Sequence, residues 1–206
     1  ASYVSLKRNN VVTGFKEWLK KAFDIKHNIL IYVLVIVYAA IYYVIGCAIN
    51  GFEVGAPIFM LIVLIPMMLF GGGNEEVGWR MILQPELEKK FNFHLATIFT
   101  AVIWWLWHLP IFFIKGTANY TMNYFMFGIM CLMLSYALAT IRKVSKGVFP
   151  CILTHCLING LSATLVFNYS WLSCCISLVV TIIVSIIILN INKKFQKSHS
   201  TDEIYE

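Results

Sequence analysis

The chain has few charged residues. They make up 13% of its 206 residues, while 60% are hydrophobic and the mean hydropathy is +0.77. Soluble domains carry about 25% charged residues, and one of this size could not bury so much apolar surface. The net charge of +6 does not indicate a nucleic-acid partner, because the basic residues lie between apolar runs and not in one patch. An integral membrane protein with no nucleic-acid partner is the simplest interpretation.

Other absences narrow the chemistry. The six cysteines form no CxxC pair, so we expect small hydrophobic side chains and neither a disulfide framework nor a cysteine metal site. The motifs HExxH, GxGxxG and GxxxxGK[ST] are missing, which removes the common helical zinc protease and the common nucleotide-binding loops. Residues 1–26 lack the apolar core of a signal peptide. The sequence starts at Ala1 without Met, which leaves room for residues upstream.

Six apolar runs dominate the sequence. Each holds about 17–22 residues, enough for a helix to cross about 30 Å of hydrocarbon. The runs are 28–49, 56–72, 94–114, 120–141, 148–168 and 171–191. We predict an all-α, polytopic transmembrane helical bundle of about six spans over residues 27–191, between a cytoplasmic N-terminal segment, 1–26, and a cytoplasmic tail, 192–206.

The basic residues set the predicted orientation. Fifteen of the sixteen Lys and Arg residues fall in the segments 1–26, 73–93, 142–147 and 192–206, which six spans place on one side. Only Lys115 falls on the other side. Basic residues collect in cytoplasmic loops, so both termini are predicted to be cytoplasmic. We expect a multi-pass protein of a bacterial cell membrane.

Two further segments are predicted to be helical without spanning. Residues 13–23 place apolar side chains on one face and lysines on the other, after a predicted N-cap at Thr13, which is typical of an interfacial helix. The segment 74–90 starts at a predicted N-cap, Asn74, and Pro85 is expected to bend or shorten it.

Ionisable and amide side chains interrupt the apolar pattern. Buried charge in a membrane is costly and indicates a function by default. Glu76 and Arg80 are four residues apart and can pair, whereas Glu75 is offset by about 100° and stays outside that pair. His155 and Asn159 share one face of the fifth span, and His108 lies deep in the third.

Each feature has a structural explanation when taken alone. The glutamates could be a solvated helix start, and each histidine could satisfy a hydrogen bond between helices. Together they are the parts needed to activate water: a carboxylate that takes a proton, imidazoles that hold water or metal, and an amide that donates to an oxyanion.

Three short motifs resemble a known family. EEVGWR resembles the EExxxR motif of the CPBP intramembrane proteases, which include the CAAX-type proteases and the bacteriocin-processing Abi group. WWLWHLP resembles the second motif, with Trp104 four residues before His108, where eukaryotic prenyl proteases usually have Phe. HCLIN resembles HxxxN, and the order and spacing of all three match over residues 56–170.

This resemblance implies catalytic roles for four residues. Glu75 would be the general base that activates water, and His108 would hold or polarise that water. His155 and Asn159 would complete the site and stabilise the oxyanion. Glu76, Arg80 and Trp104 would support it. The family implies peptide-bond hydrolysis of a membrane-associated peptide or protein in a cavity that opens toward the cytoplasm.

Two questions stay open at this point. No cofactor is assigned, because both a zinc-dependent and a metal-free glutamate mechanism fit; a bound zinc would use His108, His155 and either Glu75 or Glu76. A metal-free site is favoured. The alternative functions are a catalytically silent immunity or interaction protein of the same fold, and a small proton-linked transporter, for which the sequence lacks the expected internal symmetry.

Overall fold

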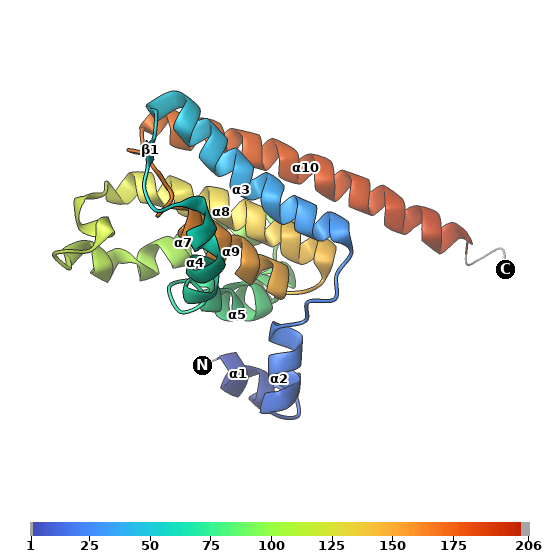
Figure 1. The fold of residues 1–206 in the computed structure, drawn as a ribbon. Helices are drawn as coiled ribbons and strands as arrows, with labels where there is room; N and C mark the ends of the chain where they lie inside the picture. Colours follow the sequence, from blue (N-terminus) through green and yellow to red (C-terminus); the bar gives the residue numbers. More distant parts are fainter. Residues whose placement is uncertain (1, 203–206) are drawn as a thin grey trace.

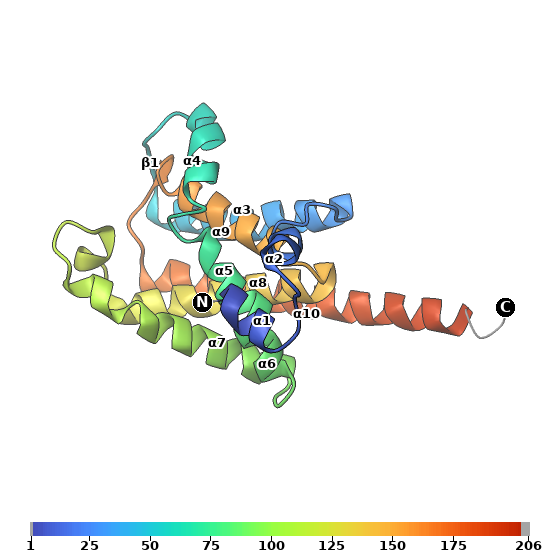
Figure 2. The same cartoon turned by 90° about the horizontal axis from the view of Figure 1, so that it is seen from below.

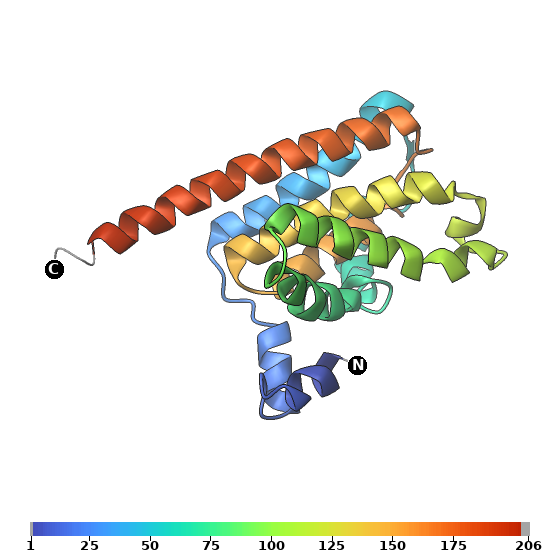
Figure 3. The ribbon, with the colours of Figure 1, turned by 180° about the vertical axis from the view of Figure 1, so that it is seen from behind.

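The protein is an all-α bundle, seen here in a computed structural model that describes residues 2–202, with side chains to residue 196 (Figure 1). Residues 1 and 203–206, the latter at the end of the predicted tail, lie outside the described part. The four long helices are α3 (Ile29–Asn50), α7 (Phe93–Trp107), α8 (Tyr124–Ser145) and α10 (Trp171–Asp202). Helix α10 packs against α3 and α8, and α7 packs on α8, as the view from behind shows (Figure 3).

Every predicted apolar run contains a helix, but two of these helices are short. Within residues 2–202, four helices are long and apolar enough to cross a membrane. The second and fifth runs give only Ile58–Met67, a 3₁₀ turn followed by α4 (Leu61–Met67), and α9 (Phe149–Leu161). The helix Ile58–Met67 is about 15 Å long at 1.5 Å per residue, half the hydrocarbon thickness. The predicted second span therefore ends about five residues early, after Pro66 and before three glycines.

The segment after α4 is helical but irregular. It begins with a 3₁₀ turn (Gly73–Glu75) and continues through α5 (Glu76–Gly78), a π-helical turn (Trp79–Leu83) and α6 (Gln84–Glu88). The predicted cap at Asn74 is wrong, because no side chain caps this start. As expected, Pro85 disturbs the helix, although the chain continues through it.

The π-helical turn has a local cause. The amide of Gln84 donates to the carbonyl of Trp79, five residues back. The next amide in that register would belong to residue 85, and proline has none. The carbonyl of Arg80 instead accepts a hydrogen bond from Nε of Arg142, at 3.1 Å, which ties this turn to α8.

The N-terminal segment forms two small helices, α1 (Ser2–Arg8) and α2 (Phe15–Ala22), beside the bundle. The residue before α2 is Gly14, so the predicted cap at Thr13 is wrong. Thr13 instead donates its amide and hydroxyl to Glu17, at 2.7 and 2.8 Å. These bonds, with Lys21, lower the pKa of Glu17 to about 2, so the contact stays charged at any ordinary pH.

The bundle is apolar outside and partly polar inside. Exposed side chains on the long helices include Ile36, Val44 and Val179, at 63%, 64% and 55% exposure. Small polar side chains are buried between helices: Thr97, Thr100, Ser135, Thr140, Thr154, Ser173, Ser177, Thr181 and Ser185. Such residues join helices in lipid, where apolar surface can face outward without penalty. The exposed apolar surface fits an integral membrane protein.

The remaining elements close one end of the bundle. Strands β1 (Glu53–Val54) and β2 (Leu165–Val166) pair antiparallel, with Glu53 opposite Val166. The 3₁₀ turns Leu109–Phe113 and Ala118–Thr121 connect α7 to α8 at the same end. The predicted cytoplasmic link 142–147 lies at the other end, where α8 stops at Lys146 in a left-handed conformation.

The orientation can be tested with a reporter inserted after Lys115 or after Lys146. The charge distribution predicts that an enzyme active only in the cytoplasm works at position 146 and fails at 115, whereas an exported reporter shows the reverse. Both insertions lie between helices, which keeps the bundle intact. A cytoplasmic signal at 115 together with an exported one at 146 would contradict the predicted orientation.

Candidate active site

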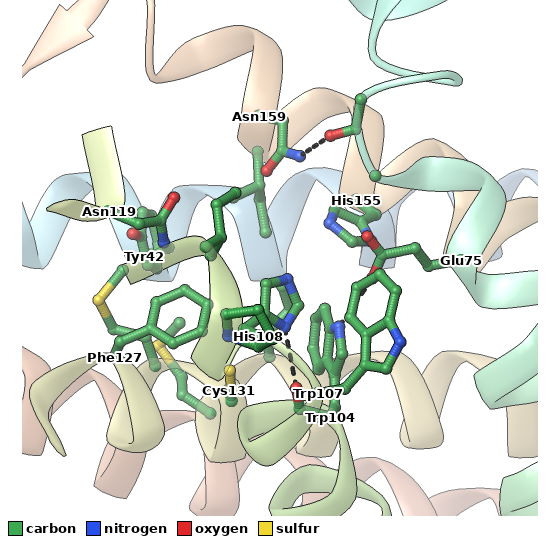
Figure 4. Close-up of a pocket in the computed structure, with 18 of the residues that line it drawn as sticks. Tyr42, Glu75, Trp104, Trp107, His108, Asn119, Phe127, Cys131, His155 and Asn159 are labelled. Atoms are coloured by element: carbon green, nitrogen blue, oxygen red, sulfur yellow. Dashed lines mark hydrogen bonds between the residues drawn. The ribbon is translucent and has the colours of Figure 1, made fainter. Parts of the chain in front are cut away.

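Glu75, His108, His155 and Asn159 line one cavity of about 660 Å³ (Figure 4). They come from the 3₁₀ turn before α5, the end of α7, and two turns of α9. Figure 4 shows Glu75 and His155 at one end of the cavity, Tyr42 and Asn119 at the other, and His108 between them. The four residues singled out from the sequence as catalytic therefore share one cavity.

The carboxylate of Glu75 is held on one side only. Its Oε2 accepts hydrogen bonds from the indole nitrogens of Trp104, at 2.8 Å, and of Trp79, at 3.2 Å. Its Oε1 accepts none from the described residues. Trp79 lies in EEVGWR four residues after Glu75, a helical spacing that could have revealed this contact in the sequence.

The carboxylate of Glu76 is buried instead. It is fully inaccessible, its Oε2 pairs with Nε of Arg80 at 3.0 Å, and its Oε1 lies 2.9 Å from Nδ1 of His155. The structure contains the ion pair expected from the i,i+4 spacing. The sequence did not reveal the contact with His155, which is 79 residues away.

A buried polar chain continues from Arg80 to the surface. Arg80 donates to Ser135 Oγ at 3.0 Å and to Gln84 Oε1 at 3.4 Å. Gln84, also inaccessible, donates to Thr97 at 3.2 Å and to Glu88 at 3.0 Å. Glu88 then pairs with Lys143. These bonds satisfy polar groups that would otherwise be costly inside an apolar bundle.

The partners of the two histidines fix their tautomers. Nδ1 of His108 lies 2.8 Å from the carbonyl of Trp104, and a carbonyl can only accept. Nδ1 of His155 faces the Glu76 carboxylate, also an acceptor. Both Nδ1 atoms therefore carry hydrogen, and the neutral rings keep a lone pair on Nε2.

Glycines bring the Glu75 turn close to α9. Gly72 has φ of +146°, and a Cβ there would lie 2.7 Å from Asn159 Nδ2 and 2.8 Å from His155 Nε2. Asn159 Nδ2 donates to the carbonyl of Gly71 at 3.0 Å. A Cβ at Gly73 would overlap the sulfur of Cys156. Because the chain turns after the short α4, Glu75 reaches the depth of His155.

Trp104 contacts more of the site than its supporting role suggested. Besides its bond to Glu75, its ring lies edge-on to His108 and His155, with centroids 5.8 and 5.4 Å apart. The guanidinium of Arg80 lies 5.8 Å from the centroid of the same ring. Trp104 is 3% exposed, so this one buried side chain contacts Glu75, both histidines and Arg80 of the buried pair.

Zinc binding would require several ligands placed close together. A catalytic zinc needs three protein ligands. Among residues 2–196, the side chains include no group of three or more His, Cys, Asp or Glu placed to hold a metal. Glu76 is already engaged by Arg80 and His155. The described side chains of His108, His155, Glu75 and Glu76 therefore do not form the zinc ligand set expected from the sequence.

The exposed rim of the cavity is formed by Gly71, Trp107, Pro110 and Ile114, whereas Trp104, Cys131 and His155 lie buried within. Three of the four rim residues lie at or just before the connection between α7 and α8. The predicted orientation puts this connection opposite the termini. The expected opening toward the cytoplasm stays a prediction.

Comparisons with known proteins cover this same region. A family model described as type II CAAX prenyl endopeptidase Rce1-like matches residues 57–161, which include all three motifs. The chain is 30% identical over 54 residues to "CAAX prenyl protease 2" of Methanococcus maripaludis. That match covers 26% of this chain and 20% of the relative, so the chain spans only a fifth of the length of this relative.

The burial of the Glu76–Arg80 pair predicts that replacing Arg80 lowers the stability of the protein far more than replacing an exposed basic residue. Arg80→Met leaves the Glu76 carboxylate buried with only His155, which should destabilise the fold by about 3–5 kcal/mol. Lys89→Met removes an ion pair with Glu86 whose side chains are 67% and 59% exposed, and should cost about 0–1 kcal/mol. Thermal unfolding of both variants in one detergent measures this. Equal melting temperatures would contradict the structural role of Arg80.

Proposed function

The chain belongs to the Rce1-like family of type II CAAX prenyl endopeptidases, and from this we propose that it is an intramembrane endopeptidase acting on a membrane-associated peptide or protein. The main support is that four polar groups line a single cavity inside an apolar bundle. They are the Glu75 carboxylate, of which only one oxygen accepts hydrogen bonds, the imidazoles of His108 and His155, and the amide of Asn159. Burying such groups in a membrane is costly, and ionisable residues in membrane segments therefore indicate a function.

In the proposed mechanism, Glu75 is the general base. Oε2 is occupied by two indole donors, so Oε1 is the oxygen left to bind water. His108 Nε2 is a second acceptor in the same cavity. A water that donates one hydrogen to each acceptor has its lone pairs directed away from both, toward a bound carbonyl. As the water attacks, its proton moves to Glu75.

Asn159 then serves the developing oxyanion. One hydrogen of its amide is used by the carbonyl of Gly71, which fixes the group, and the other is available to the cavity. His155 Nε2 carries a lone pair in the neutral ring, so His155 can donate to the oxyanion only as an imidazolium. The proton taken by Glu75 passes to the amine nitrogen of the leaving fragment, and the C–N bond breaks.

The proposed mechanism uses no metal, and its support is that the side chains of residues 2–196 include no group of three or more His, Cys, Asp or Glu placed to hold one. The proposed location is the cell membrane of a bacterium, with both termini cytoplasmic. A silent immunity protein would keep the buried pair for folding but would not need Glu75 as a base. The first experiment therefore separates the two candidates.

Glu75→Gln should lower the hydrolysis rate by about 10²–10⁴, because glutamine keeps the size of the side chain but cannot take a proton. The measurement is cleavage of a pooled peptide library by the purified protein in detergent, read by mass spectrometry. Glu86→Gln is the matched control, since Glu86 is exposed and outside the cavity, and it should retain full activity.

Cleavage by the native protein that persists unchanged in Glu75→Gln would remove Glu75 from the role of base. No Glu75-dependent cleavage of any peptide would favour the silent protein. The same assay with a metal chelator should show no loss. Loss on chelation, with recovery on adding zinc, would replace the metal-free proposal with a zinc-dependent one.

Gly72→Ala should abolish cleavage while Gly14→Ala does not. The new methyl group at residue 72 would overlap Asn159 and His155 on a backbone that alanine rarely adopts. Gly14 lines neither cavity, a Cβ there meets no described atom within 4 Å, and its extended backbone suits any residue. Rates and melting temperatures of both variants should be compared. An active Gly72→Ala enzyme would show that the close approach is dispensable.

A further inference from the structure

A second cavity of about 680 Å³ lies on the other side of Glu75. One wall comes from the N-terminal helices, through Ser2, Tyr3, Ser5, Phe15 and Trp18. The opposite wall comes from the start of the irregular helix and from α7. Figure 2 shows α1 lying over α5 and α6, seen from below. The motifs of the sequence gave no indication of this cavity.

The two cavities meet at the proposed base. Glu75 and Trp107 line both of them. Trp104 lines only the first cavity and Trp79 only the second, yet both indoles donate to the same carboxylate oxygen. Trp79 and Trp107 pack edge to face, with ring centroids 5.9 Å apart. The Glu75 carboxylate therefore sits in the partition between two binding spaces.

The second cavity has the lining of a peptide-binding site. Most of its wall is aromatic or aliphatic, from Tyr3, Phe15, Trp18, Val77, Trp79, Ile82 and Trp107. Ser2, Ser5 and Asn74 add a few polar groups that can bond to a backbone. Both cavities fall within the range of about 300–1,000 Å³ that is usual for ligand sites.

We propose that the two cavities bind the two sides of one substrate, so that the residues before and after the cleaved bond occupy different cavities. This proposal rests on the proposed endopeptidase function. An enzyme that cuts inside a chain must hold the chain on both sides of the cleaved bond, and the two cavities that meet at Glu75 provide that space. The substrate class is an extended peptide segment with bulky apolar side chains on both sides of the bond.

The test places a tryptophan in each cavity in turn and measures which residues are preferred on each side of the cleaved bond. Ser5→Trp should disfavour bulky residues at a position on one side of the cleaved bond, by about 10-fold or more in kcat/KM. Asn119→Trp, in the first cavity, should do the same on the opposite side. Tyr3→Ala widens the second cavity. On the side of the cleaved bond where Ser5→Trp disfavours bulky residues, Tyr3→Ala should favour larger ones.

Val4→Trp is the matched control, because Val4 is 49% exposed on the same helix and does not line the cavity. It should cleave with the native preference. Melting temperatures identify any variant that has unfolded, and the remaining cavity variants then decide the result. The probe is the same peptide library, in which preference is read separately on each side of every cut.

The outcomes separate this inference from the proposed function. Suppose that cleavage depends on Glu75. If the second-cavity variants then keep the native preference, or change it on the same side as Asn119→Trp, the two-cavity inference is wrong. The proposed endopeptidase function is not affected by that result. If the native protein cuts nothing, or Glu75→Gln cuts as well as the native protein, the proposed function fails, and this inference fails with it.

Discussion

The contact of the buried Glu76 carboxylate with Arg80 and His155 is the interaction on which the rest of the structure depends. An uncompensated charge inside an apolar bundle would cost several kcal/mol, so Glu76 is stable only with both Arg80 and His155 against it. Arg80 in turn requires Ser135 on α8 and Gln84 one turn further on. Satisfying one charge therefore fixes the positions of the irregular helix, α8 and α9 relative to one another, and fixes the tautomer of His155.

Two adjacent glutamates thus have opposite environments. A helical rotation of about 100° turns Glu76 into the bundle and Glu75 toward the cavities. Glu76 has both oxygens engaged by charged or ionisable partners, whereas Glu75 has one oxygen engaged by neutral indoles and one available. The first arrangement suits a group that holds structure, and the second suits a group that exchanges a proton.

The short α4 and the glycines after it determine the depth of the site. A full-length second span would have delivered Glu75 to the boundary of the membrane. Because Ile58–Met67 covers only about 15 Å and Gly72 adopts a backbone that needs no Cβ, the chain turns against α9 beside His155. The same turn leaves room on the far side of Glu75, where α1 and α2 close the second cavity.

The sequence by itself determined the local features. Apolar runs predicted where the four long helices, α4 and α9 lie, and helical spacing predicted that Glu76 meets Arg80 and that Glu75 stands apart. These features follow from backbone periodicity alone. Only the tertiary structure decided that Glu76 also holds His155, that Trp104 bonds to Glu75, and that a second cavity adjoins Glu75. These contacts join residues from different helices, and no local pattern specifies how distant helices pack.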